Sequence, residues 1–164
     1  MKTLLLMRHA KSDWDADYEA DHDRPLNERG VRSARLMGRV LAEEGLVPDL
    51  IISSTAVRAR TTAELAIEAG KWGSEIRLDR SLYDEGPRGV LAVGASAPDV
   101  DGLMLVGHQP TWSMLVSAVT GERAEMKTAT VAVIELDIES WADLAGASGT
   151  LTRVLDPKTY DRKP

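Results

Sequence analysis

The sequence predicts an α/β protein, built as a three-layer α/β/α sandwich around a mostly parallel mixed sheet. Short apolar runs alternate with helical patterns over the first two thirds of the chain, which is typical of parallel strands joined by helices. Two strand-like segments then follow each other near the C-terminus and indicate an antiparallel addition. The 164 residues contain no internal repeat, low-complexity stretch or linker, so we expect a single domain over residues 1–164.

Strands are predicted where short apolar runs are bounded by polar residues or turn formers. They are expected at residues 2–8, 50–52, 75–78, 103–106, 130–136 and 149–155. The segments left as loops, ambiguous connections or termini are 11–27, 80–101 with a short helix near 90–93, 138–148, and a polar, frayed tail at 157–164.

Three longer helices are predicted from apolar spacing and capping residues. The first begins at the N-cap Asn27 and ends near Gly45. The second is capped by Ser54 or Thr55 and stops at Gly70, a residue type that favours helix C-termini. The third carries Pro110 in its first turn and extends to about residues 120–121.

Composition excludes several function classes. The net charge of −6 argues against general nucleic-acid binding, which needs a basic surface. Without cysteine, the chain has no disulfide, thiolate metal site or cysteine nucleophile, which fits a cytoplasmic protein. The apolar run at 3–7 is too short for a signal peptide or a membrane span, so no membrane partner is expected. A monomer is compatible with these properties.

Two histidines and two arginines follow predicted strands. Arg8 and His9 end the first strand, and His108 follows the strand at 103–106. Arg58 falls in the first turn of the helix after the second strand, where free N–H groups and the helix dipole favour an anion. Because open α/β proteins bind ligands at the carboxyl ends of their strands, we expect these four side chains to surround one phosphoryl group.

The residue types fit phosphoryl transfer. A neutral His9 can attack phosphorus through a ring nitrogen and form a phosphoramidate. The guanidinium groups of Arg8 and Arg58 are planar and permanently charged. They suit the phosphoryl oxygens, over which the charge of the transition state spreads. His108 can donate a hydrogen bond or a positive charge, and the backbone N–H of Gln109 can do likewise. This chemistry requires neither a metal nor a cofactor.

Four segments resemble the signature blocks of the histidine phosphatase superfamily, also called phosphoglycerate mutase-like. In chain order they are Leu6–Ser12, Arg24–Gly30, Ser53–Thr62 and Val106–Pro110. The small size and Ala10 after the histidine are most similar to the SixA-type branch, the phosphohistidine phosphatases. The fold of that family, an α/β/α sandwich around a mixed sheet, agrees with the pattern above.

The resemblance implies a role for each matching residue. His9 would be the nucleophile that becomes phosphorylated, and Arg8, Arg58 and His108 would complete the phosphate pocket. Arg24 and Ser12 would add substrate contacts. The fit implies a metal-independent phosphohydrolase.

The proton donor is less defined. Larger family members carry an acidic donor in the middle of the chain, and Asp84 and Glu85 follow Leu82-Tyr83 in that region. Either is a candidate general acid or, more commonly for such residues, a solvated loop carboxylate. Without an acid the site would favour substrates with good leaving groups, such as phosphohistidine.

Other polar and aromatic residues receive structural interpretations. The Asp-rich stretch at 13–23 is expected to be solvated, and His22 within it to be a loop residue, because no metal-ligand spacing links the three histidines. Trp14 and Tyr18 are candidates for a substrate rim. The other tryptophans, Trp72, Trp112 and Trp141, are expected to pack in the core.

These inferences favour a SixA-like protein phosphohistidine phosphatase whose partner is a phosphorylated protein. One alternative is a phosphatase of small phosphoesters, such as sugar or nucleotide phosphates. The other is a non-catalytic module that binds phosphate or a phosphoprotein.

Overall fold

Six strands form one mixed sheet in the computed structural model, which describes residues 1–161. The strand order is β3-β2-β4-β1-β5-β6. The strands are β1 (Lys2–Arg8), β2 (Leu50–Ser53), β3 (Glu75–Leu78), β4 (Gly102–Gly107), β5 (Val131–Leu136) and β6 (Gly149–Leu155). The pairs among β1 to β4 are parallel, and β5 pairs antiparallel with both β1 and β6. The predicted mostly parallel mixed sheet is confirmed.

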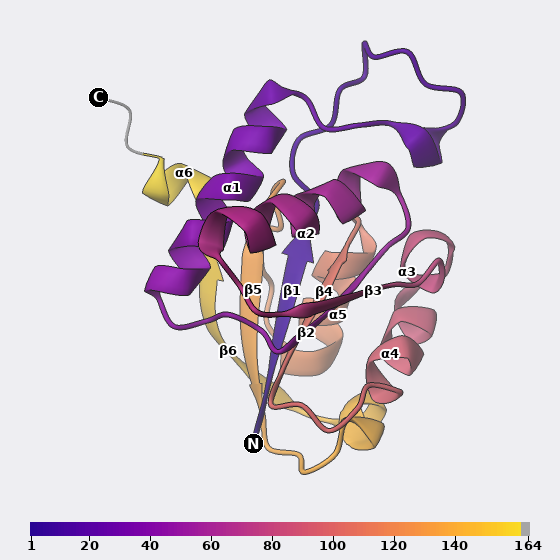
Figure 1. Ribbon diagram of the computed structural model, residues 1–164. Coiled ribbons are helices and arrows are strands. Elements are labelled where there is room, and N and C mark those ends of the chain that lie inside the picture. The colour runs from indigo at the N-terminus through magenta and orange to yellow at the C-terminus, as the bar shows by residue number, and fades with distance from the viewer. Residues whose placement is uncertain (162–164) are drawn as a thin grey trace.

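Helices cover both faces of this sheet (Figure 1). The α-helices are α1 (Glu28–Glu43), α2 (Val57–Gly70), α3 (Ser81–Asp84), α4 (Pro87–Ala95), α5 (Thr111–Thr120) and α6 (Pro157–Tyr160), and the 3-10 helices are η1 (Asp21–Asp23) and η2 (Trp141–Gly146). The helices α1 and α2 lie on one face, and α4, α5 and η2 on the other. The chain therefore has the predicted three layers.

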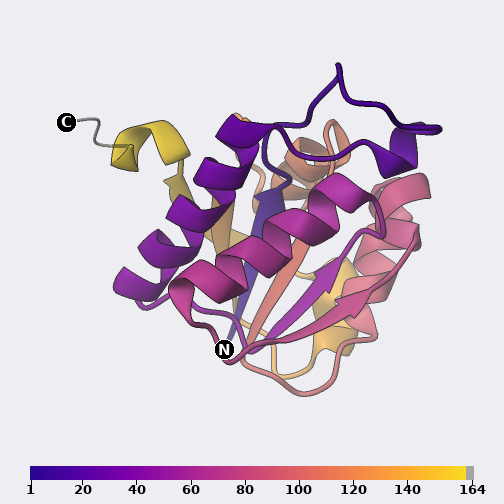
Figure 2. The same cartoon turned by 45° about the horizontal axis from the view of Figure 1, so that its top comes forward.

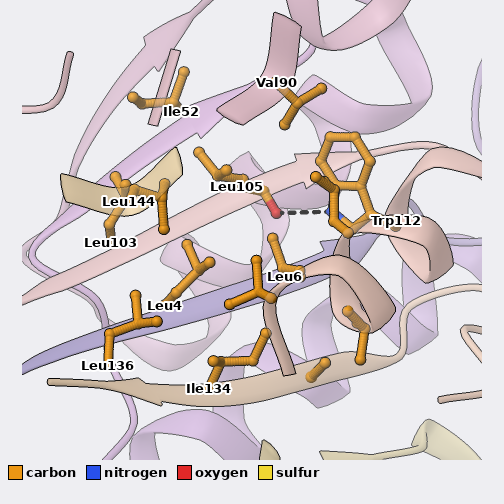
Figure 3. Close-up of a cluster of buried hydrophobic side chains, with 14 of the residues drawn as sticks. Leu4, Leu6, Ile52, Val90, Leu103, Leu105, Trp112, Ile134, Leu136 and Leu144 are labelled. Atoms are coloured by element: carbon orange, nitrogen blue, oxygen red, sulfur yellow. Dashed lines mark hydrogen bonds between the residues drawn. The ribbon is translucent and has the colours of Figure 1, made fainter. Parts of the chain in front are cut away.

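The central strands are buried on both faces, which explains their unbroken apolar runs. In β1, Leu4 and Leu6 point toward α5, whereas Leu5 and Met7 point toward α1 and α2. Trp112 fills the first of these cores and donates its indole N–H to the carbonyl oxygen of Leu105 at 3.1 Å (Figure 3). Trp72 and Trp141 are also buried, so the packing role predicted for these tryptophans is confirmed.

The second helix corrects the predicted caps. It begins at Val57, and its N-cap, Ala56, has no side-chain cap. Ser54 instead accepts a hydrogen bond from the Ala56 N–H at 3.1 Å, and its hydroxyl lies 2.8 Å from Nε2 of His108. At the other end Lys71, not Gly70, takes the left-handed conformation, with φ of 56°. Gly70 lies so close to α1 that a Cβ there would meet the Gly38 carbonyl oxygen at 2.3 Å, so its small size serves helix packing.

Other boundaries agree with the prediction or extend it. Asn27 caps α1 by accepting a hydrogen bond from the Gly30 N–H at 2.8 Å. Pro110 precedes α5 as its N-cap rather than lying in its first turn. The segments 80–101 and 138–148 contain short helices that were not predicted in detail.

The predicted frayed tail is wrong over its first residues. Asp156 caps α6 by accepting a hydrogen bond from the Lys158 N–H at 3.0 Å, and Pro157 is buried. The remainder of the predicted tail, residues 162–164, lies outside the described residues.

Candidate active site

The strand register brings His9 and His108 together. Arg8 of β1 lies opposite Gly107 of the parallel strand β4, so the next residue of each strand leaves the sheet at the same edge. The His9 N–H donates to the Gly107 carbonyl oxygen at 3.0 Å, and the two imidazole centroids lie 5.2 Å apart. The pairing that was predicted from two separate strand ends is thus set by backbone hydrogen bonds.

A pocket of about 480 Å³ opens at this edge. The helix α2 begins beside it and places Arg58, which is buried, in the pocket wall. The loop after β1 passes over the same end of the molecule, next to the start of α2 (Figure 2). The pocket is lined by Arg8, His9, Lys11, Ser12, Trp14, Arg24, Arg58, His108, Gln109, Lys127 and Thr128. All seven residues predicted to be catalytic or to bind substrate are therefore part of one pocket.

His9 has its proton on one defined nitrogen. Its Nδ1 lies 2.6 Å from the Ala10 carbonyl oxygen. Because a carbonyl can only accept, Nδ1 carries the proton, and Nε2 keeps its lone pair. Burial is the main cause that lowers the pKa of His9 to about 3; the hydrogen bond to Ala10 opposes it, and the positive charges of Arg58 and Arg8 act in the same direction as burial. The imidazole is therefore neutral at physiological pH, with a lone pair on Nε2.

His108 is also neutral. Burial, followed by the charge of Arg58, lowers its pKa to about 4. Its Nε2 lies 2.8 Å from the hydroxyl oxygen of Ser54. The Ser54 hydroxyl, which accepts from the Ala56 N–H, can also donate to Nε2, and in that arrangement Nδ1 of His108 carries the proton.

Three buried nitrogen atoms of the pocket residues have no hydrogen-bond partner among residues 1–161. They are Arg8 Nε, Arg58 Nε and His108 Nδ1. A buried donor without a partner costs about 1–3 kcal/mol, so each such group calls for an explanation. All three atoms belong to residues that line the pocket, where bound phosphoryl oxygens would supply acceptors and the complementary charge.

Arg24 and Ser12 extend the site toward the rim. The buried Arg24 donates from Nε to the Ser12 hydroxyl at 2.9 Å, and its guanidinium lies 3.6 Å from the ring centroid of Trp14. Trp14 is 69% exposed and lines the pocket, as predicted, whereas Tyr18 does not line it.

Asp21 is a site residue that sequence reasoning missed. Its carboxylate accepts from Arg58 Nη2 at 3.0 Å, from the Tyr83 hydroxyl at 2.9 Å and from Arg24 Nη1. Its backbone carbonyl also accepts from Arg58 Nη1, at 2.8 Å. Partial burial acts to raise the pKa of Asp21, but the hydrogen bonds from Tyr83, Arg58 and Arg24 outweigh it and bring the pKa to about 2. The carboxylate therefore stays ionised and holds both arginines.

The segment expected to supply an acid brings a tyrosine to the site instead. The Tyr83 ring packs edge-on against His108, with centroids 5.5 Å apart, and also against His22 at 4.8 Å. Neither Asp84 nor Glu85 lines the pocket. Both are exposed, and Asp84 lies 3.1 Å from Arg80 Nε. The predicted general-acid role of these two carboxylates gains no support from their positions.

Within residues 1–161, no group of three or more His, Cys, Asp or Glu side chains is arranged to hold a metal ion. His22 is placed as a structural residue, with Nε2 lying 2.7 Å from the Thr55 hydroxyl. In the same residues no helix is both long enough and apolar enough to cross a lipid bilayer.

A strand edge that combines a neutral histidine, whose Nε2 keeps its lone pair, with several fixed cations is suited to binding phosphoryl groups. Residues 4–85 match the family model of the histidine phosphatase superfamily, branch 1. The chain belongs to this superfamily and to its SixA-type branch, and it is a phosphatase.

Relatives and solved structures agree on the family. SixA from Nakamurella multipartitia is 31% identical, with a TM-score of 0.84 over 95% of this chain and 96% of the other. SixA from Agrobacterium tumefaciens is 32% identical, with a TM-score of 0.82 over 95% and 98% of the two chains. An uncharacterized protein of Mycobacterium tuberculosis is 37% identical over 84% of this chain and 91% of its own length.

Proposed function

We propose that this phosphatase hydrolyses phosphohistidine in proteins through a phosphorylated His9, without a metal ion. The observation that carries the proposal is the state of His9: a neutral ring with a free Nε2, beside the side chains of Arg8, Arg58 and His108. A neutral nitrogen nucleophile facing fixed positive charge is what attack on an anionic phosphoryl group requires.

The reaction proceeds in two displacements. The Nε2 lone pair of His9 forms a bond to phosphorus while the bond to the leaving group breaks, and the leaving atom keeps that electron pair. A water molecule then attacks the phosphorylated His9, the P–N bond breaks, and its electron pair returns to Nε2. In both steps the arginine forks and the Nδ1–H of His108 balance charge on the phosphoryl oxygens. Inorganic phosphate is the product.

The side chains available in the pocket as proton donors favour phosphohistidine as the substrate. None of the described residues lining the pocket is an aspartate or a glutamate. An alkoxide leaving group needs a strong proton donor, whereas a phosphohistidine whose other ring nitrogen carries a proton releases neutral imidazole without one. Phosphohistidine phosphatase is also the activity proposed for the SixA proteins of Nakamurella multipartitia and Agrobacterium tumefaciens. The cytoplasmic location and the monomeric state stay predictions.

The first test is hydrolysis of p-nitrophenyl phosphate in excess EDTA by the wild type and by His9→Ala. This generic ester has a good leaving group, so the wild type should turn it over while the variant loses at least about a thousandfold in rate. Circular dichroism confirms that the variant is folded. Equal rates would remove His9 as the nucleophile, and loss of wild-type activity in EDTA would contradict the metal-free mechanism.

A substrate panel separates the alternatives. The proposal predicts a higher kcat/KM for a phosphohistidine peptide than for sugar or nucleotide phosphates. A hundredfold preference for a metabolite would establish the small-phosphoester alternative. Binding of phosphopeptide without turnover of any substrate would establish the non-catalytic module.

A further inference from the structure

A second groove, strongly basic, adjoins the active site. It has a volume of about 570 Å³ and lies along α1, beside α6. Its charged lining residues are Lys11, Arg29, Arg32, Arg35, Arg39, Lys127, Lys158, Asp156 and Asp161. Seven of the 20 Lys and Arg residues therefore gather in one groove of a chain whose net charge is −6. A local reversal of charge on this scale indicates an anionic binding partner.

Most of these cations are not neutralised by the protein. Arg35 lies 3.7 Å from Glu68, and Lys127 lies 3.7 Å from Asp156. The other five, Lys11, Arg29, Arg32, Arg39 and Lys158, form no ion pair within residues 1–161. Asp156 is in turn occupied, because it also caps α6. The positive charge of the groove is therefore available to a ligand.

The groove is continuous with the catalytic pocket. Lys11, Lys127 and Thr128 line both. Along α1 the exposed arginines Arg29, Arg32 and Arg39 follow one another at intervals close to whole turns, so they lie on one stripe of the helix. At 1.5 Å per residue the stripe is about 15 Å long. A ligand that leaves the pocket past Lys11 meets this row.

We propose that the groove binds an acidic segment of the protein substrate while the phosphoryl group of that substrate lies at His9. This inference rests on the proposed function and names the kind of protein on which it acts. A row of separate cations matches carboxylates spaced along a polypeptide, whereas a small phosphoester bound at His9 would end before it reached Arg39. The acidic remainder of the surface disfavours a long nucleic acid, which would be repelled beyond the groove.

Binding is tested apart from catalysis. A fluorescent peptide of alternating Glu and Ala, without phosphate, is titrated with the protein at low ionic strength and followed by anisotropy. The wild type should bind it, and Arg32→Glu/Arg39→Glu should bind about tenfold or more weakly. Arg88→Glu, which reverses an exposed cation on α4 outside the groove, is the matched control and should bind like the wild type. No binding of the acidic peptide, or equal loss with Arg88→Glu, would overturn the proposal.

A kinetic experiment then tests whether the groove contributes to recognition of the substrate. Two phosphohistidine peptides are compared, one with Glu and one with Gln in the flanking positions. The wild type should prefer the acidic peptide, mainly through KM, and the double variant should lose that preference while its rate on p-nitrophenyl phosphate stays unchanged. Equal kcat/KM for the two peptides would overturn the docking proposal, as would tighter binding of single-stranded DNA than of the acidic peptide.

The outcomes for the two proposals remain distinguishable. If the acidic peptide binds but no phosphohistidine peptide is hydrolysed, the proposed function fails and the groove stands as an acidic-peptide site. If both phosphohistidine peptides are hydrolysed equally well, the function stands and the docking site fails.

Discussion

At the scale of single residues, a backbone carbonyl sets the chemistry of His9. Because the Ala10 carbonyl fixes the proton on Nδ1, Nε2 keeps its lone pair without the help of a separate base. Both imidazoles are buried near cations, which disfavours their protonated forms. His9 and His108 therefore stay neutral. In the proposed mechanism, an arriving phosphoryl dianion would reverse that field, so that substrate binding itself would create the favourable electrostatics of the reaction.

Asp21 is a positioning residue for the two arginines it holds. In Asp21→Asn the amide keeps the shape but loses the charge that binds Arg58 and Arg24, so we expect kcat/KM on p-nitrophenyl phosphate to fall about tenfold with little change in thermal stability. Asp21→Glu should recover part of the loss. Asp23→Asn, a change to an exposed neighbour, is the control. A lower KM in Asp21→Asn would show instead that the carboxylate competes with phosphate.

The sequence could predict the site residues that lie at the ends of strands. It could not predict the residues that hold those side chains in position. Arg8, His9 and His108 are found because each lies at the end of an apolar strand that is recognisable in the sequence. Asp21 and Tyr83 lie 62 residues apart, on a 3-10 turn and a short helix, and only the folded chain brings their side chains within 2.9 Å. The one available signal was an aspartate three residues before Arg24, within a stretch whose charge suggested solvation.

At the scale of elements, α1 and α2 pack through glycines. A Cβ at Gly38 would lie 2.2 Å from the Ala66 carbonyl oxygen, and one at Gly70 would lie 2.3 Å from the Gly38 carbonyl oxygen. These approaches set the distance between the two helices, and α2 carries Arg58 into the pocket. Apolar periodicity predicted both helices, but it contains no information about how closely their backbones approach.

Gly38→Ala should therefore be destabilising, although alanine is the better helix former by about 1 kcal/mol. Because the added methyl meets backbone, we expect a loss of about 1–3 kcal/mol in the free energy of unfolding, measured by urea denaturation. Gly73→Ala is the control, since nothing lies within 4 Å of the position that its Cβ would take. An increase in stability for Gly38→Ala would contradict the close packing.

At the scale of the whole molecule, the buried neutral histidines make the fold sensitive to acid. In the unfolded chain both titrate near 6.5, whereas in the folded protein the pKa values are about 3 and about 4. The unfolded state therefore binds more protons as pH falls below 6.5, and stability decreases. Asp21 adds to this effect only at lower pH, between its ordinary pKa of 3.8 and about 2.

The expected size of this effect is on the order of 1–2 kcal/mol per histidine between about pH 7 and pH 5. The free energy of unfolding of the wild type is compared with that of His9→Gln/His108→Gln at both pH values. The double variant should lose less stability on acidification. Parallel losses in the two proteins would show that the histidines are not held neutral by the fold.

The proposed mechanism requires His9 to carry the phosphoryl group during turnover, and this step is tested by trapping the phosphorylated protein. The wild type is mixed with p-nitrophenyl phosphate, quenched rapidly in alkaline denaturant, where phosphohistidine survives, and digested for mass spectrometry. We expect a phosphoryl group on His9, formed no more slowly than the steady-state rate. Turnover with an unmodified His9, or phosphorylation confined to His108, would contradict it.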